Sequence, residues 1–562
     1  MIRTRAQESR AAIEKLYVMM RHLFNRGFYK PFGVSGEALR SALLSLRPEI
    51  YGSIADEEKV ELNGLAYVIE RLPKGIEECR FIKLTSEEGY ADSHFETIIP
   101  SKRRRRCFRI DKETMYIEVT RGRSEIYDIL THLTFLFIEA EKIRKYALDE
   151  KGQVTRQWEK LEEIATGDVT VNAENREKAL AYLSGMVGRP FQETQDALGR
   201  FEETADDHNG LFRVIYGLGK QAIEEAKGLK LRQVSFTPTL RERIGHHLYG
   251  SRWAQHIKYT LQDNNLLDRP IHIISANLHS VMNCLYATPA LKGTGDAHKS
   301  IQELALMLSK SSSKSKQAKV SDYGLDHGFI PVPDQSGTNI GVQIFDCAQL
   351  RWEDMSAEIQ QPSLKKSEKA PVLLIMDYAF GEQAFETMDE LLKPFKDEGK
   401  VVPLDIRSVN IMGKAGILTG GKGDIMIPNA HVFEGTADNY PFENALSKED
   451  FDGEGLDVYA GPMISVLGTS LQNKDVLSYF RHSSWKAIGL EMEGAHYQKA
   501  IQAASKIRGT IASDVVLRYA YYASDNPLHT GSTLASGPLG EIGVRPTYLI
   551  TLKMLNKIFT EV

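Results

Sequence analysis

Cysteine is scarce in this sequence, and long apolar runs are missing from it. The 562 residues include four cysteines, none at CxxC spacing and none beside a histidine cluster: Cys79, Cys107, Cys284 and Cys347. A disulfide framework or a structural zinc site is therefore not expected, and the pattern fits a reducing cytoplasm. No run reaches the roughly 18 apolar residues of a membrane span, and the N-terminus lacks the uninterrupted apolar segment of a secretory signal. These absences predict a cytoplasmic protein.

An excess of positive charge is also missing. The formal net charge is −5 at pH 7, which gives no bulk argument for binding nucleic acid or an anionic membrane. The run KRRRR at Lys102–Arg106 is a local exception. We interpret it as a solvated loop or a set of partners for carboxylates, with a phosphate-bearing effector or nucleic acid as the alternative. No motif indicates a metal or an organic cofactor.

Hydrophobic residues make up 42% of the chain and charged residues 26%, as in soluble globular proteins. The length suggests two or three domains at roughly 150 residues each. Residues 1–265 read as a mainly helical N-terminal domain of unknown role, because apolar residues recur there at helical spacing, as in Ile13, Leu16, Met20 and Leu23. One strand pair is expected within Cys107–Val119.

The pattern changes in residues 266–562. Short apolar runs alternate there with helical patterns: Ile271–Ser275, Val372–Met376, Val409–Gly413, Asp424–Pro428 and Thr510–Ser524. This alternation predicts an α/β domain with a mixed or mostly parallel sheet flanked by helices. Ligands of such sheets bind at the carboxyl ends of the strands. The Ser/Lys-rich stretch Ser309–Lys319 is expected to be a mobile loop, with a substrate lid as the alternative.

Three segments at predicted strand ends carry polar groups suited to chemistry. GLEMEGAHY at Gly489–Tyr497 places two carboxylates where a helix N-terminus would also explain them. YYASDNPLH at Tyr521–His529 ends an apolar strand in Ser-Asp, which a capping turn would also explain. MGKAGILTGGKGD at Met412–Asp424 reads as a strand entering a Gly-rich turn, where backbone amides could approach an anion.

The order of these segments resembles the nucleoside phosphorylase and nucleosidase superfamily. MGKAGIL…GDIMIP looks like its GSAGGL…GDIVVP segment, GLEMEGAHY like its VEMEGAA motif, and ASDNP like its catalytic Ser-Asp segment. HVFEGTADNYP at His431–Pro441, together with SDNPLH, is most similar to AMP nucleosidases. The resemblance covers residues 370–562 and extends to 268 if Ile271–Ser275 is the first strand. It implies a nucleoside-phosphorylase-like C-terminal fold.

The resemblance also implies roles for individual residues. Glu493 would grip the ribose hydroxyls and Asp525 would be the general acid that protonates the departing base. Supporting positions would be Ser524 beside Asp525, Glu491 and Met492 beside Glu493, and Gly413 and Gly381 at the glycine turns. Lys414 stands where the family has a small residue and could hold a 5′-phosphate or form an interface salt bridge. His279 and Glu382 are candidates for activating water, although a structural histidine and a capping residue explain them as well.

The implied reaction is cleavage of the N-glycosidic bond of a purine nucleoside or nucleotide. Phosphorolytic members of the superfamily hold phosphate with an Arg just before the glycine turn, and Val409–Met412 contains none. Hydrolysis is therefore favoured, with a phosphorylase or a non-catalytic nucleotide-binding protein as alternatives. The expected partners are a purine nucleoside or nucleotide and further copies of the chain, since superfamily members are usually oligomers. Membrane and nucleic acid are not expected partners, and no cofactor is expected.

Overall fold

The computed structural model describes residues 4–296, 298–362, 369–530 and 539–561. The chain forms two compact units: unit 1 comprises Met1–His246 and Ser470–Val476, and unit 2 comprises His247–Thr469 and Leu477–Val562. Helix α10 (Leu248–Asp263), which the sequence-based division at 265/266 assigns to the first domain, belongs to unit 2.

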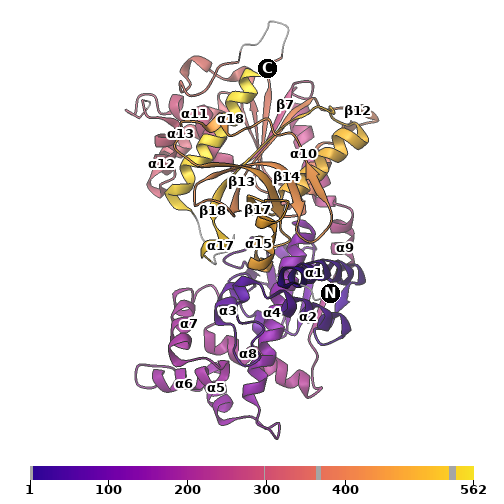
Figure 1. Ribbon diagram of the computed structural model, residues 1–562, viewed down its shortest axis with the longest axis vertical. Helices are drawn as coiled ribbons and strands as arrows, with labels where there is room; N and C mark the ends of the chain where they lie inside the picture. The colour runs from indigo at the N-terminus through magenta and orange to yellow at the C-terminus, as the bar shows by residue number, and fades with distance from the viewer. Residues whose placement is uncertain (1–3, 297, 363–368, 531–538, 562) are drawn as a thin grey trace. The chain divides into compact units, whose positions relative to one another are not determined.

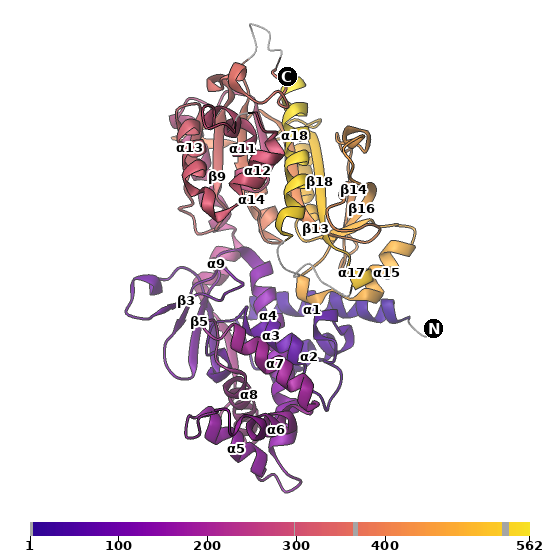
Figure 2. The same ribbon diagram turned by 90° about the vertical axis from the view of Figure 1, so that its left-hand side faces the viewer.

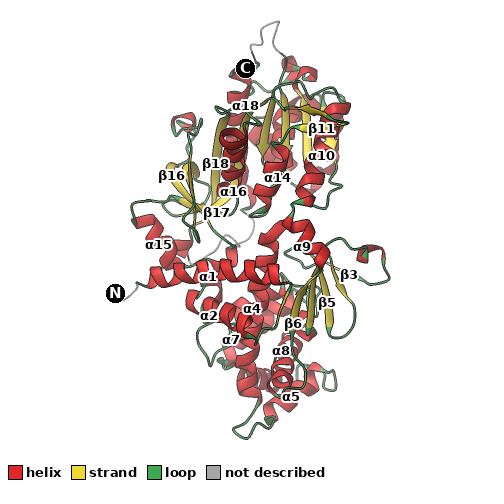
Figure 3. Cartoon of the chain, turned by 90° about the vertical axis from the view of Figure 1, so that its right-hand side faces the viewer, coloured by secondary structure: helices red, strands yellow, loops and turns green. Residues whose placement is uncertain are grey.

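Unit 1 is mostly helical and also contains a six-stranded sheet with the order β1-β6-β2-β5-β4-β3 (Figure 3). Its helices are α1 (Arg5–Arg26), α2 (Val34–Leu46), α3 (Leu62–Ile69), α4 (Gly122–Ala147), α5 (Arg156–Ala165), α6 (Arg176–Val187), α7 (Phe191–Glu203), α8 (Leu211–Ala226) and α9 (Pro238–Gly245). Its strands are β1 (Phe28–Tyr29), β2 (Phe81–Thr85), β3 (Thr97–Ile98), β4 (Cys107–Arg109), β5 (Thr114–Glu118) and β6 (Gln233–Phe236). The strand pair expected within Cys107–Val119 is confirmed as antiparallel β4 and β5.

The basic run Lys102–Arg106 leads into β4 and meets carboxylates. Arg103 donates to both oxygens of Asp128, and Arg105 donates to the same carboxylate at 2.6 Å. Arg106 forms an ion pair with Glu118 at 2.5 Å. For these three arginines, the interpretation of the run as a set of carboxylate partners is confirmed.

Unit 2 is an α/β structure built on a ten-stranded mixed sheet (Figure 1). Its strands are β7 (Ile271–Ser275), β8 (Phe329–Val332), β9 (Val342–Asp346), β10 (Val372–Met376), β13 (Ile406–Ile417), β14 (Ile425–Phe433), β15 (Asn439–Pro441), β16 (Val458–Ser465), β17 (Gly489–Glu491) and β18 (Val516–Asp525); β11 (Phe395–Asp397) and β12 (Lys400–Val402) form a separate hairpin. Besides α10, its helices are α11 (Leu278–Ala290), α12 (Ile301–Leu308), α13 (Lys314–Leu325), α14 (Gln383–Leu391), α15 (Lys474–His482), α16 (Gly494–Gln502), α17 (Pro527–Thr530) and α18 (Val544–Thr560), with the first residues of α15 counted in unit 1.

Part of the sheet closes on itself. Strand β13 pairs with β18, β18 with β14, β14 with β16, β16 with β17, and β17 with β13. Of the remaining strands, β7, β10, β9 and β8 extend from β13 in that order, and β15 pairs with β14. Strands β7 and β18 both run parallel to β13, so their carboxyl ends meet at one edge.

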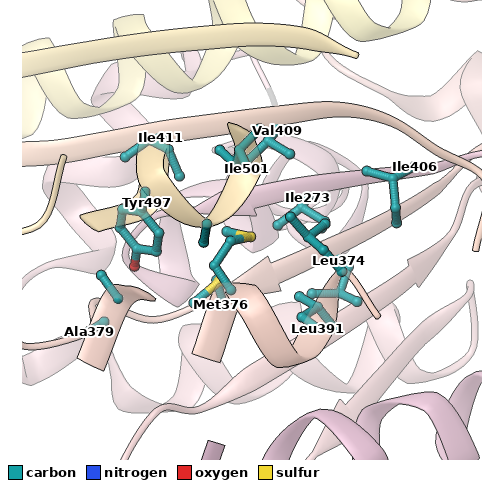
Figure 4. Close-up of a cluster of buried hydrophobic side chains, with 14 of the residues drawn as sticks. Ile273, Leu374, Met376, Ala379, Leu391, Ile406, Val409, Ile411, Tyr497 and Ile501 are labelled. Atoms are coloured by element: carbon teal, nitrogen blue, oxygen red, sulfur yellow. The ribbon is translucent and has the colours of Figure 1, made fainter. Parts of the chain in front are cut away.

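Helices cover both faces of the sheet, as the buried strand patterns require. On one face, residues of α10, α14 and α16 pack against odd-numbered positions of β13, such as Val409 and Ile411 (Figure 4). Figure 4 shows Tyr497 and Ile501 among the strand residues of this core. On the other face, α11, α12 and α18 pack against even-numbered positions such as Met412 (Figure 2). The predicted helix-flanked mixed sheet is confirmed.

Two expectations from the sequence are wrong. Ser309–Lys319 is not a loop: it contains a short 3₁₀ turn and the first turns of α13, where Val320 anchors the helix in the core beneath a Ser/Lys-rich surface. Gly413 and Lys414 do not lie in a glycine turn, because β13 continues to Ile417 and the turn follows it.

Among the described residues, none of the helices is long and apolar enough to cross a membrane. The described part of the chain also contains no group of three or more His, Cys, Asp or Glu side chains placed to hold a metal ion.

Candidate active site

The two segments that carry the predicted catalytic carboxylates flank a single residue of β13. Gly416 pairs with Leu490 of β17 on one side and with Asp525 of β18 on the other. Adjacent strands lie about 4.8 Å apart, so the backbones of Leu490 and Asp525 are roughly 10 Å apart. The register of β18 shifts between Ala415 and Gly416, which re-aims the last residues of that strand. The sheet therefore brings the EMEG and Ser-Asp segments to one edge.

Glu491 is buried and shapes the start of α16. Its carboxylate accepts hydrogen bonds from the Ser465 hydroxyl and from the backbone N–H groups of Glu493, at 2.5 Å, and Gly494. Ser465 Oγ also accepts the N–H of Ala495 at 3.0 Å. These bonds satisfy the free N–H groups of a helix N-terminus. Burial raises the pKa of Glu491 to about 7 despite them.

Glu493 directly precedes α16 and is tied to the start of α14. Its Oε1 accepts the backbone N–H of Gly381 at 2.9 Å. Gly381 has φ of 56°, a left-handed conformation that favours glycine and aims this N–H. Burial, and next the charge of Glu491, raise the pKa of Glu493 to about 8. The neighbouring Met492 is buried. The structure thus groups four of the predicted site residues at the start of α16.

Asp525 is fully buried at the end of β18, with Ser524 against it. Ser524 Oγ lies 2.5 Å from Asp525 Oδ1 and 3.1 Å from the backbone oxygen of Ala415. A hydroxyl has one proton, so it can donate to only one of these acceptors. Burial raises the pKa of Asp525, opposed by the Ser524 hydroxyl and by the charges of Lys414 and Lys422. Asp525 Oδ2 has no hydrogen-bond partner among the described residues.

Lys414 projects from the middle of β13 into a cavity of about 860 Å³. The strand residues on either side of it are buried, whereas Lys414 is exposed. Its neighbour across the strand pair, Tyr522, lines the same cavity, as does His279 at the start of α11. Burial lowers the pKa of His279, so the imidazole is neutral near pH 7. Lys414 is the only Lys or Arg among the described residues of the lining.

The remaining predicted residues have other surroundings. Gly413 leaves room for a ring, because a Cβ there would lie 3.1 Å from the Tyr521 side chain. Glu382 precedes α14, and its charge acts on the pKa of His496; it is not among the described residues that line the Lys414 cavity.

Sequence reasoning missed several groups at this edge. Tyr378, Tyr522 and Asn277 line the Lys414 cavity, and Ser465 holds Glu491. Asn277, Tyr378 and Ser465 share one signal, since each is at or just after the carboxyl end of an apolar strand, whereas Tyr522 lies inside β18. Polar residues at those ends could have been collected strand by strand.

Comparison with known proteins identifies a family for this chain and solved structures that are distantly similar to it. A family model described as "Family of unknown function (DUF6909)" matches residues 37–296 and 303–560. No curated protein matches the chain.

Solved structures that are similar to the chain include three nucleosidase-type enzymes. The 5′-methylthioadenosine/S-adenosyl homocysteine nucleosidase of Campylobacter jejuni is 12% identical, with 51% of this chain and 99% of that chain covered and a TM-score of 0.31. The futalosine hydrolase of Helicobacter pylori strain 26695 is 13% identical, with 51% and 98% covered and a TM-score of 0.31. The nucleosidase of the first type from S. pneumoniae is 10% identical, with 51% and 99% covered and a TM-score of 0.30.

Proposed function

The chain belongs to the family of unknown function DUF6909, and we propose that it hydrolyses the N-glycosidic bond of a purine nucleoside or nucleotide. The observation that carries the proposal is the pair of acids at one edge of the sheet, half-buried Glu493 and buried Asp525, each with a raised pKa. Cleavage of this bond needs a carboxylate near the developing ribosyl cation and an acid near the departing base. The motif order in residues 370–562 supports the same reaction.

Asp525 is the general acid in this proposal. When its carboxyl is protonated on Oδ2, which has no hydrogen-bond partner among the described residues, that O–H is free to donate to the departing base. The Ser524 hydroxyl donates to Oδ1 and so orients the carboxyl. When the proton has gone to the base, the same hydroxyl stabilises the new carboxylate, so Ser524 serves both protonation states.

Glu493 holds the ribose. One of its oxygens is fixed by the Gly381 N–H, which orients the carboxylate to accept ribose O–H groups. With a pKa of about 8, the carboxyl loses a proton when it takes two O–H donors. Glu491 acts through the backbone, because its bonds fix the turn that presents Glu493.

Water is the favoured nucleophile over phosphate. A phosphate dianion held for attack needs several strong donors. Of the described residues lining the cavity, Lys414 is the only one with a fixed positive charge. One lysine suits a 5′-phosphate carried by the substrate, which agrees with the motif similarity to AMP nucleosidases. We therefore expect a purine nucleoside 5′-monophosphate to be a better substrate than its nucleoside.

The test is release of free base from AMP, other purine nucleotides, adenosine, inosine and methylthioadenosine, each with and without inorganic phosphate. We expect release without phosphate from wild type and a loss on the order of 10²-fold or more in Asp525→Asn. Asp452→Asn, a change at an exposed carboxylate, is the matched control and should keep full turnover.

Three results would overturn this proposal. Release only with phosphate would make the protein a phosphorylase. Nucleotide binding without release of any base would make it a binding protein. Unchanged turnover in Asp525→Asn would remove the proposed acid.

A further inference from the structure

A second cavity opens at the opposite edge of the same sheet. It has a volume of about 670 Å³ and is lined by the amino ends of β7, β13 and β18, where His272, Ser408 and Arg518 lie. The carboxyl ends of these strands carry the candidate active site. His272 and Arg518 are 6% and 1% exposed, so both of these polar side chains are buried at this end of the sheet. The proposed reaction uses neither.

We call His272, Ser408 and Arg518 the floor of this cavity. A chain of hydrogen bonds among buried side chains determines where the protons of these residues lie. Arg518 Nη1 donates to Asn410 Oδ1 at 3.2 Å, so the other amide atom of Asn410 is the nitrogen. That nitrogen donates to Ile273 O and to Ser408 Oγ, each at 2.9 Å. Ser408 therefore donates its own proton to His272 Nδ1, 2.8 Å away. Burial, with the charges of Arg518 and Arg407, lowers the pKa of His272 to about 3. The ring is neutral, and its proton is on Nε2.

Two N–H groups on this floor lack an acceptor. Neither His272 Nε2 nor Arg518 Nε has a hydrogen-bond partner among the described residues. A buried donor without an acceptor destabilises the fold until an acceptor binds it. Arg518 Nη2 is paired with the carboxylate of Glu561, a residue that follows α18 and is 44% exposed. The carboxylate of Glu561 therefore already binds one nitrogen of Arg518. Because the Glu561 side chain is half-exposed, it can rotate away into solvent.

The rim differs from the floor. Lys369 is paired with Asp268, and Arg407 with Asp405 at 2.8 Å. The exposed Asp514 also lines the cavity. Carboxylates at a rim accept hydrogen bonds from hydroxyl groups, whereas His272 Nε2 and the Arg518 guanidinium can only donate. The cavity falls in the size range of small-metabolite sites, roughly 300–1,000 Å³.

We propose that this cavity binds a phosphate monoester of a small polyhydroxylated molecule, with the phosphoryl group on His272 and Arg518 and the hydroxyl groups at the acidic rim. Three N–H groups, His272 Nε2 and Arg518 Nε and Nη2, match the three terminal oxygens of a phosphoryl group. The phosphoryl group replaces the Glu561 carboxylate on Arg518. Helix α18 lines the Lys414 cavity at its first turns and leads to Glu561.

The experiment is calorimetric titration of the full chain with ribose 5-phosphate, with ribose and inorganic phosphate titrated separately. It uses the Lys414→Ala background, which removes the lysine of the other cavity, so binding does not depend on the proposed reaction. We expect ribose 5-phosphate to bind at one site per chain and more tightly than either fragment. His272→Phe should weaken it on the order of 10-fold.

Glu561→Gln should strengthen binding severalfold, because the competing carboxylate loses its charge. This change is at a half-exposed residue, so it tests the proposal even if His272→Phe does not fold. Glu541→Gln, an equal change before the other end of α18, is the matched control and should leave affinity unchanged. The proposal is overturned if ribose 5-phosphate does not bind in the Lys414→Ala background. It is also overturned if its affinity is the same in Glu561→Gln and Glu541→Gln.

Discussion

Lys414 and Asp525 act on each other by charge, and this gives the activity a predictable pH dependence. Burial raises the pKa of Asp525, while Lys414, and next Lys422, lower it. A general acid works when protonated, so kcat/KM should fall as pH rises through the pKa of Asp525. Lys414→Met removes a positive charge, disfavours the carboxylate and should move this alkaline limb to higher pH. The measurement is kcat/KM against pH with a nucleoside lacking phosphate.

Lys422→Met is the control for that profile. The Lys422 charge also lowers the pKa of Asp525, by less than Lys414 does. The alkaline limb should therefore move in the same direction by a smaller amount. A limb that stays in place in Lys414→Met would mean that another group sets it.

Glu491 makes stability depend on pH in the opposite sense to most paired carboxylates. Its pKa is about 7 in the folded protein against an ordinary 4.5. The folded state keeps a proton that the unfolded state loses, so stability is fully present below about pH 4.5 and is lost as pH rises through 7. The loss is about 3 kcal/mol at most, from 1.36 kcal/mol per pKa unit.

Glu491→Gln should flatten this dependence between pH 5 and 8. The Gln oxygen can accept the two backbone N–H groups, and its NH₂ can donate to Ser465, so the turn is retained. Urea unfolding at both pH values measures the effect. Glu443→Gln, at an exposed carboxylate, should keep the wild-type slope; an equal slope in Glu491→Gln would contradict the raised pKa.

Single residues show how far local patterns reach. Glu493 and Asp525 could be singled out as candidates because each lies at or just after the end of an apolar strand, within a motif of fixed order. Lys414 was assigned to a turn because Gly413 and Gly416 read as turn residues. In the fold, Gly413 makes room for the Tyr521 ring inside β13. The need for space at Gly413 comes from β18, about a hundred residues away, so the residues around Gly413 in the sequence do not reveal it.

At the scale of elements, the start of α16 depends on a close approach. A Cβ on Gly494 would collide with the His431 ring and lie 2.7 Å from the Tyr521 hydroxyl. Gly494→Ala should therefore push α16 away from β14 and β18 and cost about 1–3 kcal/mol of stability. Because Glu493 precedes this helix, turnover should fall as well.

Thermal unfolding and base release measure these two effects. Gly468→Ala is the matched control, since a Cβ there meets nothing within 4 Å. If Gly494→Ala and Gly468→Ala unfold at the same temperature, the helix start is not as tightly packed as described.

Elements were predictable where their signal is local. Ile271–Ser275 and Val372–Met376 are continuous apolar runs, and both are buried parallel strands. The unit 1 sheet was predicted only for Cys107–Val119, because β2 pairs with β6 across about 150 residues and neither strand is long. The opposite error occurred at Ser309–Lys319, where a loop was expected and most of the segment is helical. Its Ser and Lys residues form the solvent face of a helix that is held by a few apolar contacts.

At the scale of the whole molecule, the cysteines report on each unit separately. Cys79 and Cys107 lie in unit 1, and Cys284 and Cys347 lie in unit 2. All four are buried, and burial raises the pKa of each thiol, so native protein should react with none of them. Labelling then requires that the unit containing the thiol opens.

A substrate that binds only unit 2 should protect only the unit 2 cysteines. At 100 times its Kd, a ligand stabilises the unit it binds by about 2.7 kcal/mol, which slows opening-limited labelling on the order of 100-fold. Pulse alkylation of Asp525→Asn with saturating AMP, read by mass spectrometry of each cysteine peptide, makes the comparison. We expect slower labelling of Cys284 and Cys347 and unchanged labelling of Cys79 and Cys107. Equal protection of all four would show that the two units unfold as one, and protection of Cys79 and Cys107 alone would place the nucleotide in unit 1.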